Sequence, residues 1–197
     1  MINEERKIIL LGSGGHAKGI LEILRAQKLF PSAIFINKKD LYDENYFQLK
    51  PYYRDSIWQS YNPDQYTIII GVGRTHQQDS IRNNLFKIAK NKKFYIPALC
   101  HSSAKIAEGV KIYSGSQIMM GACIQPGVRV HSNVVINTSA SIDHDVVIRK
   151  NVFIGPGVII CGNVEIGENS YIGAGSVVVP NTKIPCNSFF KAQSLIK

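Results

Sequence analysis

Asp143, His144 and Asp145 form the segment of this sequence whose side chains are best suited to move a proton. An imidazole titrates near pH 6.5, so it can accept a proton at neutral pH. A nearby carboxylate stabilises the charged imidazole and raises its pKa. The segment therefore indicates a general base; the alternative is a solvated histidine without a role in chemistry.

A second candidate lies in the glycine-rich stretch GSGGHAKG, which follows the apolar residues 7–11. Its spacing, Gly12-x-Gly14-x-x-Ala17, resembles a turn in which glycines let backbone amides approach a pyrophosphate at a helix N-terminus. The acid that would hold a ribose at the end of the next strand is absent, because that strand ends with NKK. We therefore do not expect NAD, and the turn either binds phosphate or is purely structural.

The elements that must position these residues differ between the two halves of the chain. In the first half, apolar runs predict strands at 7–11, 33–36, 66–73 and 93–99, and amphipathic spacing predicts helices at 16–27 and 77–89. Alternating strands and helices predict a small parallel α/β domain. Residues 40–63 are polar and aromatic, which indicates a long connection or a loop that stacks on a sugar.

The second half contains a hexapeptide repeat. Ile or Val occupies every sixth position without an insertion, at residues 106, 112, 118, 124, 130, 136, 142, 148, 154, 160, 166, 172, 178 and 184. Small or β-branched residues follow each of the first thirteen by four positions, and Gly or Asn recurs between the runs. A period of six fits neither an amphipathic helix nor a long strand, and it predicts a parallel β-helix of hexapeptide repeats.

Composition excludes several classes of protein. The net charge of +9 is spread over both halves, with 15 Lys and Arg against 9 acids in residues 1–97 and 8 against 5 in residues 98–197. We find no motif for nucleic-acid binding, so small phosphorylated ligands fit this charge better. There is no membrane-spanning apolar run, no signal-like segment and no CxxC pair, so we expect a cytoplasmic protein without membrane insertion.

Three stretches, GSGGHAKG, IPALCHSSAKI and INTSASIDHDVVI, resemble the bacterial sugar acetyltransferases of the PglD and NeuD type. The resemblance implies an α/β Rossmann-like acceptor-binding domain at 1–97 and a left-handed β-helix that binds acetyl-CoA at 98–197. It also implies a homotrimer with acetyl-CoA between two protomers, no metal, and a nucleotide-linked amino sugar as acceptor. N-acetylation of a 4-amino group is the first expectation, and O-acetylation of a sialic acid or a related sugar is the nearest alternative.

The resemblance also assigns roles to residues. His144 is the expected general base and Asp145 the acid that raises its basicity, although the sequence does not exclude Asp143. Gly14, Gly15 and His16 are expected at the acceptor site, together with Asn37, Gly71 and Arg74. Gly173 and Ala174 are expected along the pantetheine path, and Phe153 stands where many relatives carry a second histidine that contacts acetyl-CoA.

The repeat itself adds one inference. If three hexapeptides close one coil, Gly162 is the neighbour of His144 on the next coil. Its backbone N–H would then be available to polarise the acetyl carbonyl. The alternative is that a glycine is needed at position 162 only because the corner requires an unusual φ.

Two departures from the family and two other classes of function remain open. The strand-end sequence NKK replaces paired acids, and the C-terminal residues lack the family's closing Gly-x-Pro-Ala loop. A zinc-dependent carbonic anhydrase on the same β-helix would need three histidines, whereas only His131 and His144 lie in the repeat and His101 precedes it. A catalytically silent scaffold is the last alternative.

Overall fold

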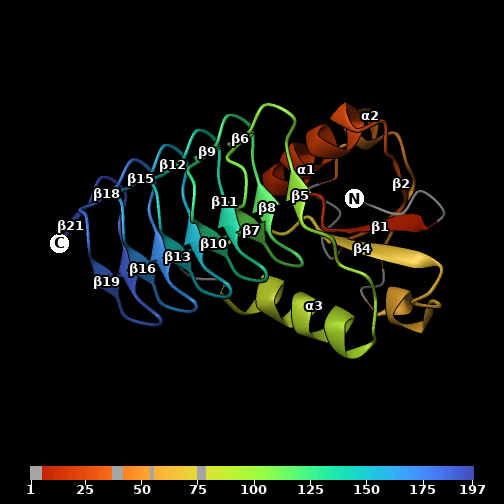
Figure 1. The fold of residues 1–197 in the computed structure, drawn as a ribbon. Coiled ribbons are helices and arrows are strands. Elements are labelled where there is room, and N and C mark those ends of the chain that lie inside the picture. Colours follow the sequence, from red (N-terminus) through yellow and green to blue (C-terminus); the bar gives the residue numbers. More distant parts are fainter. Residues whose placement is uncertain (1–5, 37–41, 54–55, 75–78) are drawn as a thin grey trace. The chain divides into compact units, whose positions relative to one another are not determined.

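The computed structural model describes residues 6–36, 42–53, 56–74 and 79–197 (Figure 1). The chain divides into two compact units, Met1–Pro97 and Ala98–Lys197. The first is an α/β unit, and the second is built from short parallel strands.

The α/β unit contains a parallel sheet of four strands in the order β3-β2-β1-β4. The strands are β1 (Lys7–Leu11), β2 (Pro31–Phe35), β3 (Pro51–Tyr52) and β4 (Tyr66–Ile70). The strand predicted at 93–99 is reduced to one bridge, between Tyr95 and Thr67. Pro97 cannot donate a ladder hydrogen bond, and Leu99–Cys100 pairs instead as β5 within the second unit.

Two helices lie on opposite sides of this sheet, α1 (Gly15–Ala26) and α3 (Asp79–Asn91) (Figure 1). Helix α1 buries one stripe, formed by Ala17, Ile20, Leu21, Ile23 and Leu24. On the other side, Phe86 and Ala89 of α3 share a core cluster with residues of β1, β2 and β4. Both helices lie within two residues of their predicted bounds.

Much of the segment predicted as a long connection is regular. It contains α2 (Glu44–Phe47), β3 and the 3₁₀ helix η2 (Ile57–Ser60). Trp58 is 1% exposed and packs on Phe94, and Tyr52 stacks on Phe35. Trp58 is therefore a core side chain rather than part of a sugar-stacking loop.

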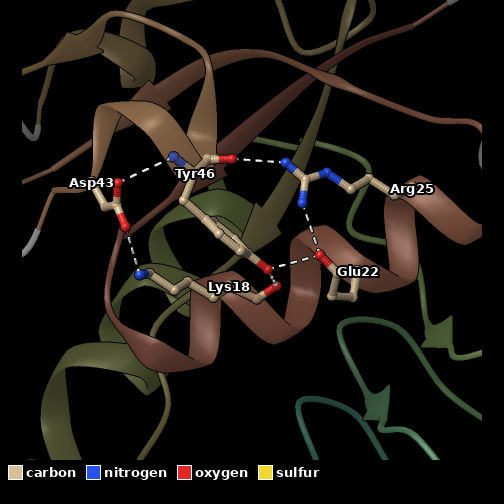
Figure 2. A network of polar contacts seen from close by, with 5 residues as sticks. All are labelled: Lys18, Glu22, Arg25, Asp43 and Tyr46. Atoms are coloured by element: carbon tan, nitrogen blue, oxygen red, sulfur yellow. Dashed lines mark hydrogen bonds and ion pairs between the residues drawn. The ribbon is translucent and has the colours of Figure 1, made fainter.

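A polar network attaches α2 to α1 (Figure 2). The Tyr46 hydroxyl donates to Oε1 of Glu22 at 2.7 Å, and Arg25 donates to the Tyr46 carbonyl at 2.7 Å. Asp43 accepts the Tyr46 N–H at the start of α2 and pairs with Lys18 at 3.0 Å. The cations of Lys18 and Arg25 lie 4.8 and 4.9 Å from the Tyr46 ring centre, so the tyrosine is held from several directions.

The second unit is a parallel β-helix whose strands form three faces. Face 1 contains β7 (Lys111–Ile112), β10 (Arg129–Val130), β13 (Val147–Ile148), β16 (Glu165–Ile166) and β19 (Lys183–Ile184). Face 2 contains β5, β8 (Gln117–Ile118), β11 (Val135–Ile136), β14 (Phe153–Ile154), β17 (Tyr171–Ile172) and β20 (Phe189–Phe190). Face 3 contains β6 (Lys105–Ile106), β9 (Cys123–Ile124), β12 (Ser141–Ile142), β15 (Ile159–Ile160), β18 (Val177–Val178) and β21 (Leu195–Ile196).

Each strand except those at the two ends of a face pairs in register with the third strand before it and the third strand after it, as Ile136 does with Ile118 and Ile154. Three hexapeptides therefore make one coil. The Ile and Val of the repeat fill the interior, and those from Ile118 to Val178 are at most 1% exposed. The row of interior residues is longer than the predicted row of Ile and Val, because Cys100, Phe190 and Ile196 continue it beyond Ile106 and Ile184. The prediction counted only Ile and Val, so it missed the Cys and Phe steps.

The corners between faces are turns with a residue at positive φ. Gly and Asn fill most of these positions, as predicted. At the corner between faces 1 and 2, asparagines form a ladder in which Asn133, Asn151 and Asn169 each donate to the next Asn at 2.8 to 3.1 Å, ending at Asn187. On the outside of face 2, the rings of Phe153, Tyr171 and Phe189 stack at 5.1 and 5.3 Å.

Candidate active site

His144 lies at the corner between β12 of face 3 and β13 of face 1. Ile142 and Val146 occupy the interior positions on either side of the corner and are fully buried. The three residues between them face outward, and the His144 side chain is 54% exposed. The imidazole is therefore accessible to a substrate.

The carboxylate of Asp145 orients this imidazole. Its Oδ2 lies 2.9 Å from Nδ1 of His144. An ionised carboxylate only accepts hydrogen bonds, so in neutral imidazole Nδ1 carries the proton and the lone pair is on Nε2. The hydrogen bond to Asp145, followed by the charge of Asp143, raises the pKa of His144 above its ordinary value. The arrangement suits a general base that acts through Nε2.

Gly162 lies next to the imidazole on the following coil, as the spacing of three hexapeptides predicts. A Cβ at Gly162 would lie 2.6 Å from Nε2 and 2.7 Å from Cε1 of His144, so the ring occupies the space that a side chain would fill. Among the residues that the structure describes, none accepts a hydrogen bond from the Gly162 N–H. The equivalent N–H of His144 donates to Oδ1 of Asp143 at 2.8 Å. The residue before Gly162 is Cys161, which has no side-chain oxygen to accept a hydrogen bond from the Gly162 N–H.

The residues predicted to contact acetyl-CoA do not gather at this corner within one chain. Phe153 lies on face 2, across the prism from the His144 corner, and its ring packs against Tyr171. Gly173 and Ala174 form the corner between faces 2 and 3, and the backbone of Gly155 packs closely against them. One chain therefore brings His144, Asp145 and Gly162 together, but not the other three.

The residues predicted at the acceptor site, apart from Asn37, follow β1 and β4, which are neighbours in the sheet. Gly71 packs so closely on Ala17 of α1 that a Cβ there would lie 2.9 Å from Cβ of Ala17. A Cβ at Gly73 would lie 3.3 Å from Cγ of His16, so the loop after β4 contacts the start of α1. These residues lie at the carboxyl ends of β1 and β4, where parallel α/β sheets commonly bind ligands.

Gly14 and Gly15 differ from the other glycines of this unit. Gly14 has a φ of −75°, and a Cβ at either residue would meet nothing within 4 Å. Gly12 has a φ of +106°, and a Cβ there would contact Val72, so its role is structural. Arg74 lies in the same loop as Gly71 and is half-buried. Asn37 lies outside the described residues.

Sequence reasoning missed Arg82 of α3. This side chain is 4% exposed, and its Nη1 donates to the carbonyls of Val72 at 2.9 Å and Ile70 at 3.3 Å. Burial lowers its pKa to about 9. Arg82 therefore holds the loop after β4 in place through its hydrogen bonds to two backbone carbonyls. Nothing in its sequence context distinguishes it from a surface arginine of an amphipathic helix.

The three histidines considered for a zinc site lie at three different corners. His101 lies between faces 2 and 3 with Nδ1 2.8 Å from Oγ of Ser103, and His131 lies between faces 1 and 2. Burial and the charges of Arg149 and Lys150 lower the pKa of His131, opposite to the change at His144. Within the described part of the chain, no three His, Cys, Asp or Glu residues are placed to hold a metal ion.

Comparisons with known proteins agree with this architecture. Residues 7–87 match the PglD N-terminal domain, and residues 145–180 match the bacterial transferase hexapeptide (six repeats). The acetyltransferase domain of PglB from Neisseria gonorrhoeae FA1090, solved in complex with acetyl coenzyme A, is 28% identical with a TM-score of 0.83, over 98% of this chain and 91% of that chain.

Two further solved structures share the fold at lower identity. PerB from Caulobacter crescentus, in complex with CoA and GDP-perosamine, is 24% identical with a TM-score of 0.80, over 97% of this chain and 91% of that chain. WeeI from Acinetobacter baumannii AYE is 18% identical with a TM-score of 0.67, over 96% and 93%. No curated protein sequence matches the chain.

The fold and the two family matches define a hexapeptide-repeat acetyltransferase with an α/β N-terminal domain, and the predicted fold class, with its left-handed β-helix, is confirmed. More particularly, the predicted resemblance to the PglD-type bacterial sugar acetyltransferases is confirmed by the match of residues 7–87 and by the similarity to the PglB domain. None of the helices in the described ranges is long and apolar enough to cross a membrane.

Proposed function

We propose that the protein transfers the acetyl group of acetyl-CoA to the 4-amino group of a nucleotide-linked amino sugar, with His144 as the general base. One observation carries the proposal: the imidazole is held by Asp145 and lies over Gly162, beside an N–H without a partner among the described residues. A base and an oxyanion donor side by side are what attack on a thioester requires. The similar PglB domain binds acetyl coenzyme A.

The reaction then proceeds through two proton transfers on Nε2 of His144. The sugar amine attacks the thioester carbonyl carbon, a carbon–nitrogen bond forms, and Nε2 accepts a proton from that nitrogen. The carbon–sulfur bond breaks next, and the imidazolium returns the proton to the departing thiolate. The products are an amide and free CoA, and the imidazole is neutral again. Such proton transfer typically contributes about 10²–10⁴ in rate.

Gly162 stabilises the intermediate in this scheme. Negative charge develops on the carbonyl oxygen during attack, and the Gly162 N–H donates to it. One such donor commonly contributes about 3 kcal/mol. Asp145 holds the imidazole in the correct tautomer and stabilises the imidazolium. Asp143 contributes charge and holds the corner backbone through the His144 N–H.

The acceptor binds to residues 1–97 in this proposal. The space beside Gly14 and Gly15 allows a diphosphate to approach the N-terminus of α1, where backbone amides and the helix dipole favour an anion. His16 and Arg74 supply further polar groups, and Gly71 allows the loop after β4 to lie close to α1. Asn37 is assigned to acceptor contacts by its place after β2, on the resemblance alone.

Acetyl-CoA binds to residues 98–197, and we propose that its site needs two chains of a homotrimer. Phe153, Gly173 and Ala174 lie on other sides of the prism than His144, so one protomer supplies the base and another supplies part of the cofactor surface. The exposed side chains of Ile159 and Leu195 on face 3 are consistent with burial between protomers.

Mass spectrometry of the products tests the proposal. The purified protein is incubated with acetyl-CoA and a panel of UDP-, dTDP- and GDP-linked 4-amino sugars, their 4-hydroxy counterparts, and free sialic acid. We expect one acetyl group on an amino sugar and none on its hydroxy counterpart. Acetylation of sialic acid alone would show O-acetyl transfer, and no transfer to any acceptor, with acetyl-CoA bound, would contradict the proposal.

A further inference from the structure

His144 and Asp145 lie between two glycines, which belong to the following and the preceding coil of the β-helix. His144 covers Gly162 on the following coil, and Asp145 covers Gly127 on the preceding one. A Cβ at Gly127 would overlap Oδ1 of Asp145 and would lie 3.2 Å from its Cγ. The Asp145 carboxylate therefore occupies the space that a side chain at position 127 would need.

The backbone fixes Asp145 at this place. Its φ is +59°, and its N–H donates to the carbonyl of Pro126 at 3.1 Å. The Cα of Asp145 thus follows the coil, and only the side-chain torsions remain to direct the carboxylate. With Oδ1 over Gly127, the other oxygen, Oδ2, reaches Nδ1 of His144.

Positive φ alone does not explain a glycine at position 127. Apart from Asp145 itself, the equivalent positions at this corner on other coils are Gly109, Asn163 and Asn181, with φ of +79°, +60° and +63°. Asparagine therefore meets the backbone requirement of this corner. A Cβ at Gly109 would meet nothing within 4 Å, so no neighbouring side chain occupies the space that a side chain at Gly109 would fill. Gly127 is distinguished by the carboxylate that lies on it.

We propose that Gly127 is a positioning residue for catalysis: by lacking a side chain, it lets the Asp145 carboxylate lie where it binds Nδ1 of His144. The catalytic part of this inference rests on the proposed function, and the positioning part rests on geometry. The charged groups of the corner itself are Asp143 and Asp145, and the adjoining corners 125–128 and 161–164 contain only one titratable side chain, the Cys161 thiol. A change at Gly127 would therefore disturb the hydrogen bond between Asp145 and His144.

Gly127→Ala and Gly109→Ala form a matched pair. Both place alanine at the same corner with φ of +80° and +79°, so the backbone strain is alike, but only the first displaces the Asp145 carboxylate. Histidine NMR titration gives the pKa of His144 in each variant, with Asp145→Asn as the reference. We expect the pKa to fall in Gly127→Ala to near its value in Asp145→Asn, and to stay at the wild-type value in Gly109→Ala.

The turnover rate follows the same pattern. We expect kcat to fall on the order of tenfold in Gly127→Ala, less than on removal of the base itself, and to change little in Gly109→Ala. If Gly127→Ala does not fold, Gly127→Asn replaces it, because asparagine accepts this φ but still fills the space of the carboxylate.

An unchanged His144 titration in the folded Gly127 variant would overturn the inference. So would an equal fall in the pKa in Gly109→Ala. The titration uses no substrate, so it decides the positioning role even if no acceptor is acetylated. A shifted pKa without any acetyl transfer would leave Gly127 as the support of Asp145 and would count against the proposed function alone.

Discussion

The β-helix and the α/β unit place their functional residues by different means. In the β-helix, a coil of constant length brings His144 over Gly162 and Asp145 over Gly127, and the members of each pair are three hexapeptides apart in the sequence. In the α/β unit, His16 and Gly73 meet only because two loops pack at the ends of β1 and β4. The comparison teaches that a repeat makes spatial neighbours countable, whereas loop contacts depend on tertiary packing.

On the proposed function, substitutions at the His144 corner of the β-helix should change the chemical step. Substitutions in the α/β unit should instead change the binding of the acceptor. His144→Asn keeps the size of the side chain roughly constant and removes the base. We expect kcat to fall about 10²–10⁴-fold with the affinity for acetyl-CoA retained. Steady-state kinetics and calorimetric binding of acetyl-CoA measure both. A variant with nearly full turnover would remove His144 from the chemistry.

Gly162→Ala tests whether the stacking of coils matters for catalysis. The added Cβ would lie 2.6 Å from Nε2, so the imidazole must move away from the Gly162 N–H. We expect kcat to fall about 10²-fold, comparable with the loss of one oxyanion donor. Cys161→Ala changes the neighbouring residue without crowding the ring and serves as the control. Equal turnover in both variants would contradict the role of this corner.

His16→Ala moves the test to the α/β unit. The side chain lies at the start of α1 against Gly73. We expect KM for the nucleotide sugar to rise about tenfold, because a hydrogen bond to a charged group is lost, while KM for acetyl-CoA stays constant. Initial rates with each substrate varied in turn measure the two constants. A rise in both constants would show that the two units do not divide binding in this way.

The pH dependence of kcat/KM tests the role of Asp145 at the His144 corner. The base acts when neutral, and its pKa is raised by Asp145 and Asp143, so kcat/KM should rise with pH through a pKa above 6.5. In Asp145→Asn the largest of these contributions is lost, and the rising limb should move to lower pH. Rate profiles of both proteins from pH 5 to 9 measure the change; a limb that stays in place would assign it to another group.

The smallest effect on activity is expected at the asparagine ladder. Asn151→Gly keeps a residue that accepts positive φ and removes a side chain bonded to Asn133 and Asn169. We expect the free energy of unfolding to fall by about 1–3 kcal/mol with kcat unchanged. Asn181→Gly, also at positive φ but outside the ladder, is the control. Chemical denaturation compares the two, and equal losses would exclude a special role for the ladder.

These two units also differ in how much the sequence alone reveals. The row of Ile and Val predicts a coil and its corners, because a period of six fits neither an amphipathic helix nor a long strand. The pairing of His144 with Gly162 follows once a coil contains three hexapeptides, as the family resemblance implies. The row of Ile and Val is shorter than the row of interior residues, since Cys100 and Phe190 fill interior positions without fitting the pattern. In the α/β unit, β1, β2, β4, α1 and α3 follow from apolar spacing to within a few residues, whereas the strand predicted at 93–99 is one bridge and α2 and β3 were not predicted.

Other features were beyond sequence reasoning because they depend on distant partners. Arg82 is spaced like a surface residue, yet it is buried under the loop after β4. Trp58 belongs to a polar segment, yet it fills the core beside Phe94. Gly127 resembles any corner glycine until the Asp145 carboxylate is seen to lie on it.

The pairing of each strand with the third strand along the chain also limits how this protein can change length. Adding or removing three whole hexapeptides would leave every column of side chains aligned, so complete coils can be gained or lost without disturbing the columns elsewhere. A gain or loss of a single hexapeptide between Gly127 and Gly162 would instead advance the chain by one corner, and the base would no longer stand beside both glycines. A whole coil added between Gly127 and Gly162 would also separate the base from one of these glycines. Evolution should therefore change the length of the β-helix outside this stretch.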